Sequence, residues 1–335
     1  MRECGNSCNL ASVPNLLGGE MAGKPGKADH VYRRPKLTKR FRLNGKICRA
    51  ASQSSDPLVR AVQKTLKAFE FSQGVGVQYT WKYLTDEAFQ RLCTQFSTET
   101  ADPFKINHLV MSHLVRVIEA YEMVSIWRSW ELISSCIINL NNDQIISAAT
   151  LSRSLIELTV SYGEAVNMLR HNFERFAWDK LHTHVLGMDQ IDSTGKHVGL
   201  EIFIERLMFG TRLPDRLTVV PGMEQKNILT IIDKMDKKLV KQGHGYTIRP
   251  HYDFLSEIVY PNTLGYARFS ATAKTLDSGW IEQLMEEKAN SQFSTTIATE
   301  CLWSLSFSTG SLDGLFGEFQ ILMKDLKQHL GSILP

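Results

Sequence analysis

Hydrophobic residues recur every three or four positions through most of this chain. Residues with that spacing share one face of an α-helix, so the pattern indicates amphipathic helices. The first clear case follows Asp56-Pro57, which suit the N-cap and first position of a helix. The apolar positions of this predicted helix are Leu58, Val59, Val62, Leu66 and Phe69.

The same periodicity, with breaks at Gly, Pro and polar clusters, predicts a series of further helices. They span residues 85–96, 103–140, 144–170, 200–209, 224–240, 252–259, 262–276, 277 or 278–285, and 294–330, the last interrupted at Gly310, Gly314 and Gly317. Neither an internal repeat nor a strand–helix alternation is visible. The chain is therefore predicted to be an all-α multi-helix bundle.

The predicted helix 144–170 is apolar on two faces. Leu151, Leu155, Leu158 and Tyr162 form one face, and Ala149, Ile156 and Val160 form another more than about 90° away. A helix that is apolar on two faces is usually buried inside a bundle. Arg153 and Glu157 flank the second face, so both are expected to lie partly inside.

Charge is distributed unevenly along the 335 residues. Residues 1–50 hold eleven Lys or Arg and three Asp or Glu, whereas the remainder of the chain holds 27 Lys or Arg and 32 Asp or Glu. Because this first part is also rich in Gly and Pro, residues 1–55 are predicted to be a disordered basic arm before a helical domain at 56–335. Such an arm can bind phosphate backbones by releasing counterions. The alternative is a solubilising leader, or an extension upstream of a start at Met21.

Composition narrows the setting of the protein. The six cysteines are scattered without a CxxC pair, which indicates reduced thiols and a cytoplasmic location. No apolar run approaches the roughly 18 residues that a membrane span needs, so no membrane association is expected.

No metal or cofactor motif stands out. His182 and His184, like His108 and His113, lack ligand partners at a recognised metal-binding spacing. Phosphate-binding loops and nucleophile elbows are also missing from the sequence. Neither a metal nor a cofactor is therefore predicted.

Two polar groups interrupt otherwise apolar helices. Arg153 and Glu157 lie four residues apart on one helix face, and Tyr252, Ser256 and Asn262 surround a helix end next to Pro261. Each group could be a structural contact between helices, because buried polar networks usually satisfy one another. The alternative is one polar ligand site between helices that contains all five side chains.

Two segments, Ser152–Leu158 and Tyr252–Asn262, resemble signatures of an uncharacterised bacterial group of helical proteins, which is similar to the HEPN superfamily (higher eukaryotes and prokaryotes nucleotide-binding). Ser152–Leu158 resembles that group's Arg-x-x-x-Glu helix, and Tyr252–Asn262 resembles its second signature. The resemblance covers about residues 100–270. It implies a helical bundle, often dimeric, and many HEPN members are metal-independent ribonucleases with an Arg-x(4–6)-His motif. Here Tyr260 stands where the group has His, and Arg175 with His182 is the pair that fits the catalytic spacing.

Two classes of function follow. The first is a non-catalytic interaction or ligand-binding module, which the missing catalytic motif favours. The alternative is a metal-independent HEPN-type ribonuclease of a toxin–antitoxin or antiviral system, with Arg175 and His182 as its catalytic candidates. The expected partners are a second copy of the chain, and RNA or another protein.

Overall fold

The structure of the chain is a computed structural model, which describes residues 34–76, 103–175, 227–260, 266–286 and 290–330. Of these residues, 77% are helical, which confirms the mostly helical class that the periodicity predicted. The described part contains eight helices and one two-stranded sheet. The predicted helices 85–96 and 200–209, and most of the predicted arm, lie outside the described residues.

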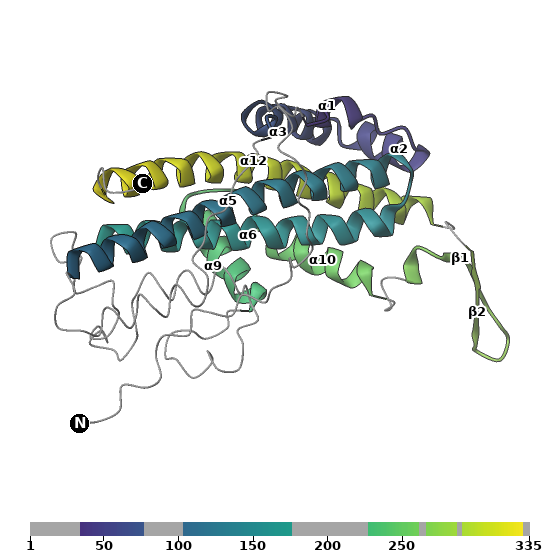
Figure 1. The fold of residues 1–335 in the computed structure, drawn as a ribbon. Coiled ribbons are helices and arrows are strands. Elements are labelled where there is room, and N and C mark those ends of the chain that lie inside the picture. The colour runs from purple at the N-terminus through teal and green to yellow at the C-terminus, as the bar shows by residue number, and fades with distance from the viewer. Residues whose placement is uncertain (1–33, 77–102, 176–226, 261–265, 287–289, 331–335) are drawn as a thin grey trace, which may run out of the picture.

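The described helices form three layers (Figure 1). The long helices α5 (Pro103–Asn141), α6 (Ile145–Arg175) and α12 (Ser291–Leu330) make the middle layer, in which α6 packs against both others. On one side lie α1 (Leu37–Arg40), α2 (Lys46–Ser54) and α3 (Asp56–Gln73). On the other side α9 (Ile228–Lys241) and α10 (Arg249–Val259) contact α6.

The core lies along α6, which is buried on more than one face as its sequence predicted. Leu155, Ile156, Val160 and Tyr162 have no exposed surface. Tyr162 stacks on Tyr121 of α5 and contacts two aromatic rings of α12, Phe316 and Phe319. This aromatic cluster joins the three middle helices.

α12 corrects the prediction that glycines interrupt the last helix. It is continuous from Ser291 to Leu330 and passes through Gly310, Gly314 and Gly317. Each glycine disfavours a helix by roughly 1 kcal/mol, but packing of the apolar face outweighs that cost. At Gly310 an added Cβ would lie 3.2 Å from Thr65 Cγ2, so this glycine also lets α3 approach closely.

The helices predicted at 262–276 and 277–285 are wrong from residue 270 onwards. Instead β1 (Ser270–Thr275) and β2 (Ile281–Met285) form an antiparallel hairpin. Gly279 adopts φ +80° in the turn, and its N–H donates to Leu276 O at 2.9 Å, which is the three-residue hairpin turn with glycine in the left-handed region. Thr and Ile at several positions also favour strands over helices.

The expected boundary at residue 56 is also wrong, because the folded part already includes α1 and α2. Leu37, Phe41, Leu43 and Cys48 are buried in the same core as the later helices. These few apolar side chains suffice because α3, α5 and α12 already offer a surface to cover. The Gly-rich part of the predicted arm, residues 1–33, lies outside the described residues.

Two helix starts differ slightly from those predicted: Ser55 and not Asp56 is the N-cap of α3, and α9 begins at Ile228 instead of residue 224. The Asn227 side chain caps α9 by accepting from Leu229 N at 3.1 Å. Despite their length, none of the described helices carries an apolar stretch sufficient to cross a membrane.

Candidate functional site

Three of the predicted site residues meet between α6 and α10. Glu157 Oε1 accepts a hydrogen bond from Tyr252 Oη at 2.8 Å and another from Arg153 Nε at 3.1 Å. Tyr252 is almost fully buried, whereas the side chains of Arg153 and Glu157 keep 25% and 35% of their surface exposed. This Arg153 network therefore reaches solvent at one end.

The Arg153 guanidinium also lies against two aromatic rings. Its central carbon is 5.4 Å from the ring centroid of Tyr252 and 5.8 Å from that of Tyr260, within cation–π range. Burial alone lowers the pKa of Arg153, but hydrogen bonds with Tyr260 and Tyr252 outweigh it and leave the pKa above its usual value. Burial raises the pKa of Tyr252, as does its hydrogen bond to Glu157. The network therefore holds a charged guanidinium and a neutral phenol.

α10 is positioned by a carboxylate of α9. Asp236 accepts hydrogen bonds from Ile248 N at 2.6 Å and Arg249 N at 2.9 Å, the first amides of α10. A carboxylate at a helix N-terminus satisfies unpaired N–H groups and complements the helix dipole. Asp236 thereby fixes where Tyr252, one turn further on, enters the bundle.

The other predicted site residues have different outcomes. Ser256 lies one turn after Tyr252, and its buried hydroxyl has no hydrogen-bond partner among the described residues. Asn262 and His182 lie outside the described residues, and Arg175 is the last residue of α6. Three members of the predicted polar site are thus in mutual contact, while the Arg175–His182 pair stays a prediction.

Replacing Glu157 by alanine is expected to lower the free energy of unfolding by about 1–3 kcal/mol, because Tyr252 and Arg153 lose their shared acceptor. Glu157→Gln keeps an acceptor oxygen and should cost less. Exchanging both Arg153 and Glu157 for methionine should also cost less than the single alanine change. Urea unfolding of the three variants measures this, and an alanine variant as stable as the wild type would refute it.

A second polar contact, between α10 and α12, has no sequence signal. His251 Nδ1 lies 2.5 Å from Glu300 Oε2, and the imidazole stacks on Trp303 with ring centroids 3.5 Å apart. Trp303 in turn stacks on Phe307, and Tyr246 meets both rings edge-on. His251 and Glu300 are about fifty residues apart in the chain, so no local sequence pattern could predict this contact between α10 and α12.

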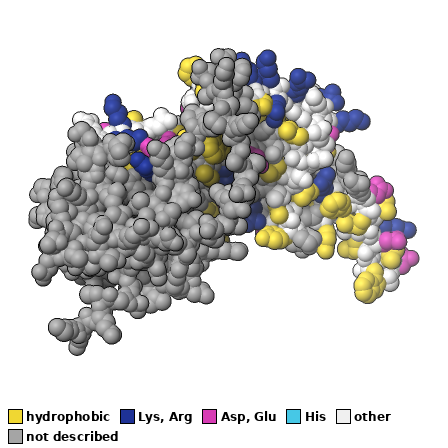
Figure 2. Space-filling model, viewed as in Figure 1, with side chains coloured by type: hydrophobic (Ala, Val, Ile, Leu, Met, Phe, Trp, Pro, Cys, Tyr) yellow, Lys and Arg dark blue, Asp and Glu magenta, His cyan; other side chains and the backbone are white. Residues whose placement is uncertain are grey.

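The most strongly charged surface lies on α1 to α3. Residues 34–73, up to the end of α3, contain ten Lys or Arg and two acidic residues, Asp56, which pairs with Arg60 at 2.7 Å, and Glu70, which accepts hydrogen bonds from Thr38. Eight of these cations are exposed and are called the basic face: Lys36, Lys39, Arg42, Lys46, Arg49, Arg60, Lys64 and Lys67. Figure 2 shows Lys and Arg side chains gathered along this edge of the molecule.

The periodicity of α3 explains why its cations face outward together. Val62, Leu66 and Phe69 are buried at spacings of four and three residues. Arg60, Lys64 and Lys67 repeat that spacing on the exposed side. Exposed surfaces normally mix both charge signs, so one sign along such a row is a distinctive feature.

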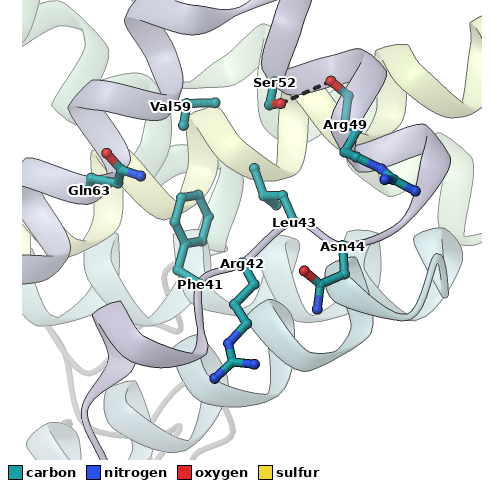
Figure 3. A pocket seen from close by; sticks show the side chains of 8 residues that line it. All are labelled: Phe41, Arg42, Leu43, Asn44, Arg49, Ser52, Val59 and Gln63. Carbon is teal, nitrogen blue, oxygen red and sulfur yellow. Dashed lines mark hydrogen bonds between the residues drawn. The ribbon is translucent and has the colours of Figure 1, made fainter.

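A cavity of about 240 Å³ opens on the basic face (Figure 3). Buried Phe41 and Leu43 with half-buried Val59 supply its apolar part, and the exposed side chains of Arg42, Asn44 and Arg49 lie along its edge. None of the described residues that line it carries a carboxylate. The lining consists of Phe41, Arg42, Leu43, Asn44, Arg49, Ser52, Val59 and Gln63.

Asn141, at the end of α5, holds the loop that forms this cavity. Its Oδ1 accepts from Leu43 N and its Nδ2 donates to Arg40 O, both at 2.6 Å. Leu43 adopts φ +46°, a left-handed conformation that costs a leucine energy and persists only where its surroundings enforce it. In the sequence Asn141 only follows the end of the predicted helix 103–140.

No family model matches the chain, and searches of curated proteins and of solved structures also yield no match. Within the described residues, no cluster of three His, Cys, Asp or Glu side chains could hold a metal ion.

Proposed function

We propose that this chain is a non-catalytic interaction protein that binds the phosphate backbone of RNA through the basic face. The observation that carries the proposal is the set of exposed cations on α1 to α3. Of the two acidic residues in these helices, Asp56 is already paired with Arg60, and Glu70 accepts hydrogen bonds from Thr38. Neutralising phosphates with Lys and Arg releases condensed counterions, which is the main source of sequence-independent affinity for nucleic acids.

The charge of the remainder of the chain supports this assignment. Outside residues 34–73 the chain holds 28 Lys or Arg and 33 Asp or Glu. A polyanion is therefore attracted to one side of the molecule and repelled by the rest, which orients it during association. The resemblance to HEPN proteins, many of which act on RNA, makes RNA the first polymer to test.

The cavity on the basic face suits the same ligand. Arg42 and Arg49 supply charged donors, and the side chains of Asn44 and Gln63 supply neutral amides. Together they can hold phosphate and sugar oxygens, while Phe41, Leu43 and Val59 offer an apolar surface to a nucleotide. A backbone ligand would thus lie along the row on α3 and across the cavity.

RNA binding is expected to be salt-dependent and to require the basic face. For a fluorescently labelled 20-nucleotide RNA at 50 mM salt, Lys64→Glu/Lys67→Glu should raise the Kd at least about tenfold and flatten its salt dependence. The matched control is Lys237→Glu/Lys241→Glu on α9, which makes the same charge change at exposed sites on the opposite side of the bundle. Fluorescence anisotropy at several salt concentrations gives the Kd values.

The outcomes separate the proposal from its rivals. Equal weakening by both double variants would mean that net charge alone attracts RNA, and would overturn the basic face. Binding to anionic lipid vesicles but not to RNA would overturn the choice of ligand. RNA cleavage that His182→Ala abolishes would establish the ribonuclease alternative instead, whereas intact RNA after incubation is the expected result.

A further inference from the structure

The hairpin exposes hydrophobic side chains that nothing else in the described part of the molecule covers. It projects from one end of the bundle (Figure 1), and every residue of β2 is exposed. Trp280 keeps 75% of its surface exposed and Ile281 67%, with Leu284 and Met285 near one half. An isolated two-stranded hairpin is only marginally stable in water, and exposed apolar groups of this kind mark interaction sites.

The two edges of the hairpin differ. Ser270 faces Met285 and Ala273 faces Gln283, so β1 has one residue more than β2 between these pairs and forms a bulge. Bulges twist a strand edge and protect it from pairing with another strand. The edge of β2 is regular, and β2 is therefore the better edge for adding a strand.

The backbone of β2 is ready to accept that strand. Trp280 O accepts from Leu276 N at 2.7 Å and Glu286 N donates to Phe269 O at 2.8 Å. Along an antiparallel strand, successive residues direct their N–H and C=O groups alternately towards the neighbouring strand and away from it. Trp280 and Glu286 bond towards β1, so the odd-numbered residues between them direct these groups away from β1, to the free edge. These residues are Ile281, Gln283 and Met285.

We propose that β2 pairs antiparallel with β2 of a second copy of this chain, centred on Gln283, to form a four-stranded sheet. The register is self-complementary: Ile281 lies opposite Met285 of the second copy, and Glu282 lies opposite Leu284 of the second copy. No two carboxylates are directly opposed, and within each copy Glu282 already faces Lys274. A two-fold axis through Gln283 gives a closed dimer and not a filament.

The dimer also explains the composition of the hairpin. On one face of the new sheet Ile281 of each copy would pack beside Met285 of the other, because alternate residues share a face. These two apolar pairs would flank the two central Gln283 side chains, and a sheet of more than two strands is more stable than an isolated hairpin. This inference is independent of RNA binding, since the hairpin and the basic face are separate surfaces.

The test is the mass of the full chain by light scattering over a range of concentrations. The wild type should approach twice the 38.0 kDa chain mass as concentration rises. Gln283→Pro removes an outward N–H at the centre of the proposed contact and should raise the dimer Kd at least about tenfold. The matched control is Ala273→Pro on β1, the residue that pairs with Gln283 within the hairpin. This change removes an N–H that points away from β2, on the opposite, bulged edge, and should leave the dimer intact.

A crosslink provides a second readout that does not depend on proline being tolerated. In the proposed dimer, Gln283→Cys places a thiol opposite the same thiol of the second copy, within disulfide distance across the two-fold axis. Mild oxidation should therefore join the two chains. Glu282→Cys, one residue away, should crosslink much less. A monomer at all concentrations, a dimer indifferent to Gln283→Pro, or equal crosslinking of the two cysteine variants would overturn the proposal.

Discussion

Replacing Tyr162 by alanine is expected to lower the free energy of unfolding by about 3–5 kcal/mol, the range for large aromatic residues truncated in a core. Tyr162 of α6 is fully buried at the junction of the three middle helices. Its ring centroid lies 5.9 Å from that of Tyr121, 4.7 Å from that of Phe316 and 5.7 Å from that of Phe319. Truncation would leave a cavity lined by rigid rings, which cannot close around it.

The control for this prediction is Tyr162→Phe, which should be as stable as the wild type or more stable by about 1 kcal/mol. The Tyr162 hydroxyl is buried without a hydrogen-bond partner among the described residues, and an unsatisfied buried polar group is destabilising. Phenylalanine keeps the ring contacts and removes that group. Urea unfolding of both variants decides the matter, and a loss of stability in the phenylalanine variant would reveal a partner for the hydroxyl.

Replacing Glu122 by glutamine is expected to stabilise the protein by about 3 kcal/mol above pH 7. Glu122 of α5 is buried, and its Oε1 has no hydrogen-bond partner among the described residues. Burial raises the pKa of its carboxyl from 4.5 to about 7, with a further contribution from the nearby charge of Glu119. A shift of this size corresponds to about 3 kcal/mol once the group is ionised in both states.

The sign of the pH dependence follows from the raised pKa. Between about pH 4.5 and 7 the folded chain keeps the proton of Glu122 while the unfolded chain releases it. The contribution of Glu122 to the free energy of unfolding is therefore largest below pH 4.5 and is lost as the pH rises towards 7. The advantage of Glu122→Gln should grow over that window and stay constant above it.

Unfolding of wild type and Glu122→Gln in urea at several pH values from 4.5 to 8 measures this difference. Glu131→Gln on the exposed side of α5 serves as the control, because an exposed carboxylate should leave the difference flat. A constant difference for Glu122→Gln across the whole range would mean that Glu122 is ionised throughout.

Parts of the Arg153 network were predictable from sequence, and parts were not. The four-residue spacing of Arg153 and Glu157 places both on one face of a helix, and the apolar residues on both sides of them indicate partial burial. The hydrogen bond from Tyr252 joins residues 95 positions apart. That contact depends on how α10 crosses α6, which Asp236 sets from a third helix.

The hairpin shows where local pattern is ambiguous. Short apolar segments such as Ile281–Met285 suit a helix or a strand almost equally, and Asp277 or Ser278 suits either a helix N-cap or a turn. The left-handed conformation of Gly279 closes the turn and decides for the hairpin.

The sequence by itself determined the long helices, since their stabilising periodicity and caps lie within a few residues of one another. It also determined the basic row on α3, because charge and helical spacing are both local properties. Only the tertiary structure decided that residues 34–55 fold against the bundle, that Asn141 holds Leu43 in a strained conformation, and that β2 leaves a regular edge exposed. Each of these depends on contacts between segments distant in the chain, which no window of neighbouring residues contains.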